Sequence, residues 1–384
     1  MRILFCFSGN SGHLEPLVPI AQAAVAAGHT VALAGRPWMR DKVESHGFAF
    51  FAAGTDVGLT PVRRPLMVAS PEQEMQAFAR AYGGRIAREQ ADDLLALCQQ
   101  WQPDVLVCEE TCFGGMIAAE CLGLPYANVI VIGSGALFNA KTLREPLNAV
   151  RAAFDLPYDP DLQIVYNAPT FSPFSACYRD PRARLPCDTQ FFRLYEPQQR
   201  RETPPWADHK HRGPLVYLTL GTVFNVESGD LFVRLVEGLR DLPIELLVTV
   251  GREIDPAELG DQPEHVQVER FIPQAEVLPY CQLVVSHAGS GSVLGALAHG
   301  LPMMLLPMGA DQPMNGERCL ALGVAQQLDP LHVQPAVVRA TANLLLESPE
   351  YRVAAQQVAA ELAAFPPPSA LIPQLEQLAS VHSA

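Results

Sequence analysis

The sequence predicts an α/β protein made of two tandem doubly wound domains, and three observations carry this prediction. The chain has 384 residues, which is about twice the length of a typical single domain. Short apolar runs alternate with longer amphipathic stretches from the first residue onward, as in βα units on a parallel sheet. A polar, proline-rich segment at residues 200–214 interrupts the alternation and is typical of an interdomain linker.

Strands are expected where a short apolar run ends in a loop. In the first predicted domain, residues 1–199, they cover residues 3–7, 30–34, 48–51, 105–108 and 127–131. Helices are expected over 14–27, which stops before Gly28, and over 71–99. From about 133 to 200 the periodicity disappears and prolines accumulate, so we expect long loops and short helices that line a cleft.

The alternation restarts after the linker and predicts a second domain over residues 215–365. Its expected strands cover residues 215–219, 245–249, 266–270, 283–286 and 303–306. Three prolines, Pro366 to Pro368, precede a last amphipathic segment at 370–380. Because proline interrupts a helix, residues 366–384 are expected to hold a separate helix that could cross to the first domain.

Charge and the length of the apolar runs exclude several kinds of partner. The 27 Lys and Arg residues against 41 Asp and Glu give a net charge of −14, and such a surface repels nucleic-acid phosphates and anionic lipid. The first apolar run is too short for a secretion signal, and the others are too short to span a membrane. We therefore expect a cytoplasmic protein with no nucleic-acid or membrane partner and with its nine cysteines reduced.

His13 is the first candidate catalytic residue. It follows the first strand and the glycines Gly9 and Gly12, which allow a tight turn, and it begins the next helix. Ligands bind at the carboxyl ends of parallel strands, and the positive end of a helix would lower the pKa of this histidine and keep it neutral, as a general base requires. The alternative is a helix-capping or surface histidine.

A carboxylate at the end of the fourth strand could orient His13. Glu109 ends the apolar run 105–108, so its carboxylate could accept the Nδ1 proton of the imidazole and leave Nε2 to accept a substrate proton. Glu110 is more typical of an acidic residue at a helix N-terminus.

The loop after the strand at 283–286 is the strongest candidate for an anion site. It reads His287-Ala288-Gly289-Ser290-Gly291-Ser292 and leads into an apolar helix. Free backbone N–H groups and the helix dipole at such a terminus suit a diphosphate. The alternative is a glycine-rich turn without a ligand. The glycine spacing is one residue too long for a dinucleotide fingerprint.

Three more loops fall at carboxyl ends of second-domain strands. Thr222 offers a hydroxyl, Gln274 an amide suited to a nucleobase, and Asp311 with Gln312 an acceptor and a donor for sugar hydroxyls. Such a polar pair favours a hydroxyl-rich sugar, because unmatched buried polar groups cost about 1–3 kcal/mol each. Each loop alone is a weak signal, but all four converge on one crevice.

The order of these motifs resembles that of the GT-B glycosyltransferases of family 1, and is most similar to bacterial enzymes that decorate antibiotic aglycones. The motifs are Gly-His-x-x-Pro, Leu-Gly-Thr, Phe-x-Pro-Gln, His-x-Gly-x-Gly-Ser, Gly-x-Pro and Asp-Gln-x-x-Asn. The resemblance implies that the first domain binds the acceptor, that the second binds a nucleoside diphosphate sugar, and that the last helix returns to the first domain.

The resemblance also implies roles for individual residues. His13 would be the catalytic base and Glu109 its orienting acid. The donor-binding residues would be Gly221, Thr222, Phe271, Ile272, Gln274, His287, Gly289, Ser290, Gly291, Ser292, Asp311 and Gln312. Phe271 stands where many relatives have Trp, which bears on base stacking and on donor selectivity.

The implied reaction is inverting transfer of a hexose to a hydroxyl of a hydrophobic natural-product aglycone. It needs no metal and no cofactor, since the nucleotide sugar is a co-substrate, and the protein would be a monomer or homodimer. Asp159-Pro160-Asp161 reads Asp-x-Asp, but its proline-rich setting predicts a turn. The alternatives are a nucleotide-sugar epimerase and a catalytically silent homologue that activates a partner enzyme.

Overall fold

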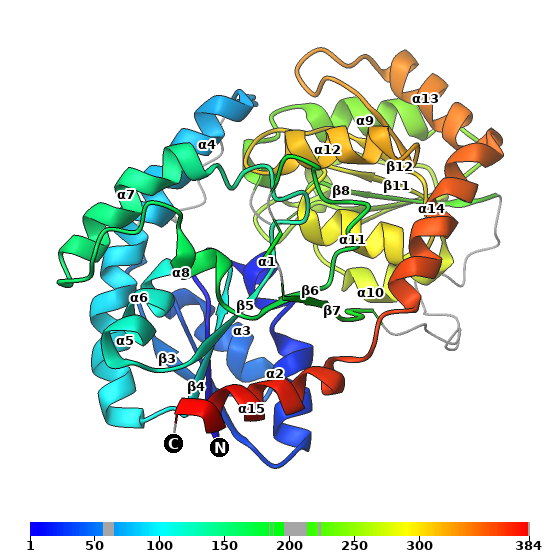
Figure 1. Cartoon of the computed structure of the whole chain (residues 1–384). Coiled ribbons are helices and arrows are strands. Elements are labelled where there is room, and N and C mark those ends of the chain that lie inside the picture. The colour runs from blue at the N-terminus through cyan, green and yellow to red at the C-terminus, as the bar shows by residue number, and fades with distance from the viewer. Residues whose placement is uncertain (57–64, 184, 187, 196–212, 222–223, 383–384) are drawn as a thin grey trace.

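The computed structural model describes residues 1–56, 65–183, 185–186, 188–195, 213–221 and 224–382. In these residues the chain forms two separate parallel sheets, each with helices on both faces (Figure 1). The predicted arrangement of two doubly wound domains is confirmed.

The first sheet has seven strands in the order β3-β2-β1-β4-β5-β6-β7. These are β1 (Arg2–Cys6), β2 (Thr30–Gly35), β3 (Ala49–Ala52), β4 (Val105–Glu109), β5 (Tyr126–Val129), β6 (Thr170–Ser172) and β7 (Thr189–Phe191). The five predicted strands are all present, and β6 and β7 were not predicted. Both are only three residues long, too short to show an alternation of apolar and polar residues.

Alternate residues of β1 face two different cores. Leu4 and Cys6 pack under one set of helices, whereas Ile3 and Phe5 pack under another, as the two-residue period of a strand requires. The first set is α4 (Pro71–Arg80), α5 (Ala87–Trp101), α6 (Phe113–Leu122), α7 (Ala140–Ala152) and α8 (Gln163–Tyr166). The second set is α2 (Val18–Ala26), α3 (Arg40–Ser45) and α15 (Ile372–His382).

The helix expected over 14–27 is divided in two. A four-residue helix, α1 (Ser11–Leu14), comes first, and α2 begins at Val18 with Pro19 in its first turn. Pro16 lies between them and has no N–H group to continue the first helix. This break keeps α1 as a short support for His13.

The helix expected over 71–99 is present but contains a π-helical turn, η2 (Ala81–Ile86), between α4 and α5. Gly83 in this turn lies against α7, where a side chain would come within 2.4 Å of Leu143 Cδ1. The prediction of only short helices and loops after residue 133 is wrong at α7. Helix α7 is a 13-residue amphipathic helix with Pro146 inside it, and this proline concealed the helical period.

The second sheet has six strands in the order β10-β9-β8-β11-β12-β13. These are β8 (Leu215–Thr219), β9 (Glu245–Thr249), β10 (Val266–Glu269), β11 (Cys281–Ser286), β12 (Met303–Leu305) and β13 (Ala325–Gln327). The main helices are α9 (Leu231–Leu239), α11 (Ser290–Ala298), α12 (Gln312–Ala321), α13 (Pro335–Glu347) and α14 (Pro349–Ala363), with the short helix α10 (Gln274–Val277) before β11. The five predicted strands are present, and β13 was not predicted.

The C-terminal segment returns to the first sheet. A short turn, η7 (Pro368–Leu371), leads into α15 beneath α2 (Figure 1), and Leu371, Ile372 and Leu375 are buried in the core that holds Ile3. Nε2 of His29 lies 3.1 Å from the Glu376 carboxylate. Residues 200–212 of the predicted linker lie outside the described residues.

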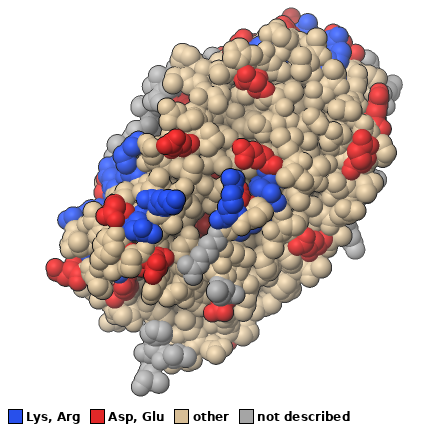
Figure 2. Space-filling model, turned by 45° about the horizontal axis from the view of Figure 1, so that its top comes forward, with Lys and Arg blue, Asp and Glu red and all other residues tan. Residues whose placement is uncertain are grey.

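Within the described residues, no helix is long and apolar enough to cross a membrane. On the face drawn in Figure 2, basic side chains are interspersed with acidic ones among many uncharged residues.

Candidate active site

His13 lies directly over Gly9 at the end of β1. A side chain at Gly9 would come within 2.1 Å of His13 Cδ2, so only glycine leaves room for the imidazole in this position. The turn is fixed by Asn10, whose side-chain oxygen accepts a hydrogen bond from Gly12 N at 3.1 Å. The sequence indicated a tight turn here, and the structure shows that the histidine ring itself requires Gly9.

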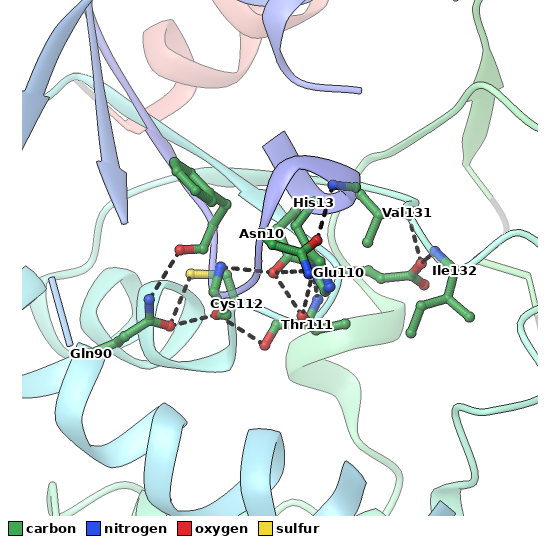
Figure 3. Close-up of polar contacts among 12 residues, drawn as sticks. Asn10, His13, Gln90, Glu110, Thr111, Cys112, Val131 and Ile132 are labelled. Atoms are coloured by element: carbon green, nitrogen blue, oxygen red, sulfur yellow. Dashed lines mark hydrogen bonds and ion pairs between the residues drawn. The ribbon is translucent and has the colours of Figure 1, made fainter. Parts of the chain in front are cut away.

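Glu109 meets His13 as predicted. Its Oε1 lies 3.2 Å from Nδ1 of the imidazole, and the carboxylate accepts hydrogen bonds from Ser8 N at 3.0 Å, Thr111 N at 2.8 Å and Thr111 Oγ1 at 2.7 Å. Figure 3 shows His13 and Thr111 close together in this cluster. Because the carboxylate is fully buried and held by three donors, it fixes the orientation of the imidazole.

The pKa values of this pair oppose the expectation for His13. Burial favours the neutral imidazole, but the adjacent Glu109 carboxylate outweighs burial, and the pKa of His13 is raised above its ordinary value. Burial likewise opposes ionisation of Glu109, yet His13 and Thr111 hold the pKa of its carboxyl below its ordinary value. The predicted lowering by a helix terminus is wrong, because α1 is only four residues long and the carboxylate dominates.

Glu110 is not an exposed acid at a helix terminus. Only 6% of it is exposed, and its Oε1 accepts hydrogen bonds from Val131 N at 2.7 Å and Ile132 N at 2.6 Å (Figure 3). Burial raises the pKa of its carboxyl to about 7. No local pattern indicated this role, because the loop after β5 that Glu110 holds is far away along the chain.

An aromatic cluster extends from His13 into the first domain and was not predicted. The ring of Tyr82, in the π-helical turn, stacks on the imidazole with the centroids 5.8 Å apart. Phe78, Phe113 and Phe138 continue the cluster, with centroid separations of 5.1 to 6.3 Å. One side of His13 is therefore bordered by aromatic rings.

His287 lies between two glycines in the second domain. Side chains at Gly221 and Gly289 would come within 2.6 Å and 2.5 Å of its ring, and Gly221 has a positive φ of 77°. The buried Nδ1 atom of His287 has no hydrogen-bond partner, and burial lowers the pKa of the imidazole to about 4. The ring is thus neutral at pH 7, and one polar atom is left for a ligand.

The first turn of α11 leaves backbone donors unused. Gly289 is the N-cap, with no side-chain capping bond, so the N–H groups of Gly291 and Ser292 have no partner within the helix. A side chain at Gly291 would meet nothing within 4 Å. The helix therefore begins at an open surface suited to an anion.

Ser290, Asp311 and Gln312 are engaged within the protein. Ser290 Oγ donates to Asp311 Oδ2 at 2.5 Å, and the Asp311 carboxylate also accepts from Asn315 Nδ2 at 2.7 Å. Gln312 is only 2% exposed, and its Oε1 accepts from Met308 N at 2.8 Å. These bonds use one oxygen of each side chain, Asp311 Oδ2 and Gln312 Oε1, and the role of the pair toward sugar hydroxyls stays a prediction.

The remaining predicted donor residues are more dispersed. Phe271 is 48% exposed, with the Arg252 guanidinium 5.5 Å above its ring, whereas Ile272 packs against the core under α11. Gln274 begins α10, and its buried Nε2 has no hydrogen-bond partner. Thr222 lies outside the described residues.

The cluster around His13 in the first domain faces the cluster around His287 and the start of α11 in the second. Asp311 in the second domain is close enough to His13 to contribute to raising its pKa. Ala288 and Ala310, in the second-domain loops, have positive φ values of 66° and 53°, and strain of this kind is concentrated at functional sites.

No group of three or more His, Cys, Asp or Glu residues in the described part of the chain is arranged to hold a metal ion. Pro160 and Asp161 lie in a turn, as predicted, and the Oδ2 atom of Asp159 beside them accepts from Ile164 N at 2.9 Å.

Comparison with solved structures agrees with the architecture. The crystal structure of the glycosyltransferase SnogD from Streptomyces nogalater matches with a TM-score of 0.79 and 25% identity over 99% of both chains. The fold and the two facing clusters define the chain as a GT-B glycosyltransferase.

Comparison with sequences specifies the family. Models described as the N- and C-terminal domains of erythromycin biosynthesis protein CIII-like proteins match residues 22–156 and 233–378. Tylactone mycaminosyltransferase of Streptomyces fradiae is 27% identical over 428 residues, covering 100% of this chain and 93% of that protein. The TDP-daunosamine transferase DnrS of Streptomyces peucetius is 26% identical over 432 residues, covering 100% and 98%. The chain belongs to this EryCIII-like family of antibiotic glycosyltransferases.

Proposed function

We propose that the protein transfers a hexose from a thymidine diphosphate sugar to a hydroxyl group of a hydrophobic natural-product aglycone, with inversion at the anomeric carbon and without a metal ion. The observation that carries the proposal is the contact of 3.2 Å between His13 Nδ1 and the buried Glu109 carboxylate. It favours the tautomer in which Nδ1 carries the proton and Nε2 accepts one.

His13 then acts as the general base. As the acceptor oxygen attacks the anomeric carbon, its proton moves to Nε2, and the bond from that carbon to the diphosphate oxygen breaks. The new positive charge on the imidazole lies beside the Glu109 carboxylate, which is already held by Ser8 and Thr111. A positioned base of this kind contributes about 10² to 10⁴-fold to a rate.

The diphosphate is assigned to the first turn of α11. The N–H groups of Gly291 and Ser292 and the unpartnered Nδ1 of His287 are donors for its oxygens. Preorganised donors stabilise a leaving group that gains charge in the transition state. These are neutral donors, since the pKa of His287 is about 4.

Two further features support the nature of the substrates. The name of the relative DnrS specifies a TDP sugar, which favours thymidine diphosphate over uridine diphosphate. The wall of Tyr82, Phe78 and Phe138 beside His13 suits a hydrophobic acceptor, because aromatic surfaces pack well against an apolar ring system.

The decisive experiment measures consumption of a panel of TDP sugars with and without hydroxylated polyketide aglycones. Transfer requires both substrates and yields a glycoside whose anomeric configuration is opposite to that of the donor by NMR. An epimerase would convert the nucleotide sugar without an aglycone, and a catalytically silent homologue would leave it unchanged. Repeating the assay in excess EDTA tests the metal independence, and loss of activity with rescue by Mg²⁺ would contradict it.

A further inference from the structure

Four consecutive backbone N–H groups after β5 are bound by side chains from two different domains. Val131 N and Ile132 N donate to Glu110 in the first domain at 2.7 and 2.6 Å. The next two N–H groups reach the second domain, where Gly133 N donates to Ser290 Oγ at 2.8 Å and Ser134 N to Asn315 Oδ1 at 3.3 Å.

The receiving groups in the second domain form a closed network. Asn315 is fully buried, and its Nδ2 donates to Ala288 O at 3.0 Å, Ser290 Oγ at 3.1 Å and Asp311 Oδ2 at 2.7 Å. Ser290 and Ala288 belong to the loop that begins α11. The network therefore fixes the loop assigned to the diphosphate.

The other end of the segment lies next to the catalytic pair. Glu110 directly follows Glu109, whose carboxylate contacts His13, and Glu110 N is tied to Val129 O of β5 at 2.8 Å. A continuous path of bonds thus joins the base, through Glu110 and residues 131–134, to the start of α11. We call this set of residues the clasp: Glu110, residues 131–134, Ser290, Asp311 and Asn315.

Burying the Glu110 carboxyl group at this position costs free energy. Burial raises the pKa of this carboxyl to about 7, although the Arg179 charge and the two backbone N–H groups act in the opposite direction. A hydrophobic residue would fill the space at a lower cost, but it could not accept two backbone N–H groups. The first-domain loops at 130 and 174–178 also enter the second-domain core through Ile130, Phe174 and Tyr178, so the clasp lies in a packed interface.

We propose that Glu110 is a positioning residue for the transfer reaction, which holds residues 131–134 so that their next N–H groups bind Ser290 and Asn315 and set the diphosphate loop opposite His13. The inference rests on the proposed function. In this inference, Ser290 and Asn315 bind the first-domain amides, and Asp311 holds these two side chains in place. Glu110 touches no reacting atom and acts through the segment.

A double-mutant cycle tests the proposal. Glu110→Ala and Ser290→Ala should each lower kcat per folded site about tenfold, with folded sites counted by calorimetric titration with thymidine diphosphate. The double variant should be no more than about threefold worse than the poorer single variant, because both changes break one path. Glu110→Gln keeps the accepting oxygen and should stay within about threefold of the wild type. Fully additive losses, or a Glu110→Gln variant as poor as Glu110→Ala, would overturn the proposal.

Hydrogen exchange provides a measurement that needs no turnover and no change at Glu110. Ser290→Ala should speed exchange of the Val131 and Ile132 amides about tenfold by residue-resolved NMR, although neither amide bonds to Ser290 itself. Ser292→Ala, in the same helix but outside the clasp, should leave both rates at the wild-type value. Unchanged rates in Ser290→Ala would overturn the clasp. If the wild type transfers no sugar, the proposed function fails, and this measurement still tests the clasp.

Discussion

The two histidines of the site differ in their polar partners and in the direction of their pKa shifts. His13 has its partner, since Glu109 lies 3.2 Å from Nδ1 and raises the pKa of the imidazole in spite of burial. The Nδ1 atom of His287 is buried without a partner, and burial lowers the pKa of the imidazole to about 4. The polar partners of His13 thus lie within the first domain, whereas His287 keeps an unpartnered Nδ1 and the start of α11 keeps N–H groups without a partner in the helix.

The proposed function accounts for this difference between the His13 side, the proposed acceptor side, and the His287 side, the proposed donor side. A general base needs a fixed tautomer before the substrate arrives, so its polar partner belongs to the protein. An anion site needs donors whose partner is the ligand, and leaving them unpaired in the free protein is the cost of that specificity. Changes on the acceptor side should therefore affect turnover, and changes on the donor side should affect binding.

The largest effect is expected from removing the base. His13→Ala should lower kcat by about 10² to 10⁴-fold while thymidine diphosphate binds with nearly the wild-type affinity, because the proposed donor contacts lie in the other domain. Steady-state kinetics and calorimetry on the same preparation separate the two quantities. A normal kcat would remove His13 from the mechanism, and a large loss of nucleotide affinity would break the division between the two sides.

Misplacing the imidazole should be nearly as harmful as removing it. In Gly9→Ala the new methyl group would lie 2.1 Å from Cδ2 of the ring, so the ring must move, and a misplacement of about 1 Å can cost about 100-fold in rate. Gly12→Ala is the matched control in the same turn, since its added carbon would meet only Asn10 Oδ1 at 3.6 Å. Equal kcat values for the two variants would show that the position of His13 over Gly9 does not matter.

On the donor side, Gly291→Val should weaken binding of thymidine diphosphate by about 1–3 kcal/mol, the scale of a polar group left unpaired. The surroundings of Gly291 are open, since a β-carbon at this position would have no atom within 4 Å, so the fold should tolerate the change. Calorimetry should show the loss, with a smaller loss for Gly291→Ala. Wild-type affinity in Gly291→Val would place the anion site elsewhere.

The charge of Glu109 should appear in the pH profile. In the proposed mechanism the neutral imidazole is the active form, so kcat/KM should rise with pH through the raised pKa of His13. In Glu109→Gln burial still lowers this pKa but no carboxylate at position 109 raises it, so the ascending limb should move to lower pH. The plateau should fall about tenfold, less than for His13→Ala, because a neutral partner still orients the ring. An unshifted limb would mean that another group titrates.

Much of the fold and the pairing of His13 with Glu109 could be predicted from the sequence, because strand ends and helix starts are local features. The strands from β1 to β5 and from β8 to β12, and the placement of His13 against Glu109, depend on short apolar runs and on the turns that follow them. Helix α7 was missed because Pro146 disguised its period. The strands β6, β7 and β13, each three residues long, have no period to detect.

The partners of individual side chains could not be predicted, because they come from distant parts of the chain. Glu110 binds amides 21 and 22 residues further on, and Asn315 binds one 181 residues away. A sequence likewise does not show which polar side chains bind within the protein. Only the fold shows that Asp311 Oδ2 accepts from Ser290 and Asn315 and that Gln312 Oε1 accepts from Met308 N.

The smallest effect, and the closest test of the contrast between the histidines, is a change in the titration of His287. Its pKa is about 4 because the ring is buried with no charge beside it. A bound diphosphate would bring negative charge to the unpartnered Nδ1 and raise this pKa, so the complex should take up protons as the pH falls from about 6 toward 4. By linkage the affinity for thymidine diphosphate should increase over that range, by up to about tenfold if the ligand raises the pKa by about one. Between pH 7 and 8 the affinity should not respond to His287, which is neutral there with and without ligand. NMR titration of the imidazole Cε1 proton in the free protein and with saturating thymidine diphosphate measures both values, with His13→Ala used to remove the other active-site imidazole. An unchanged His287 titration at saturation would mean that the phosphates do not lie beside this ring.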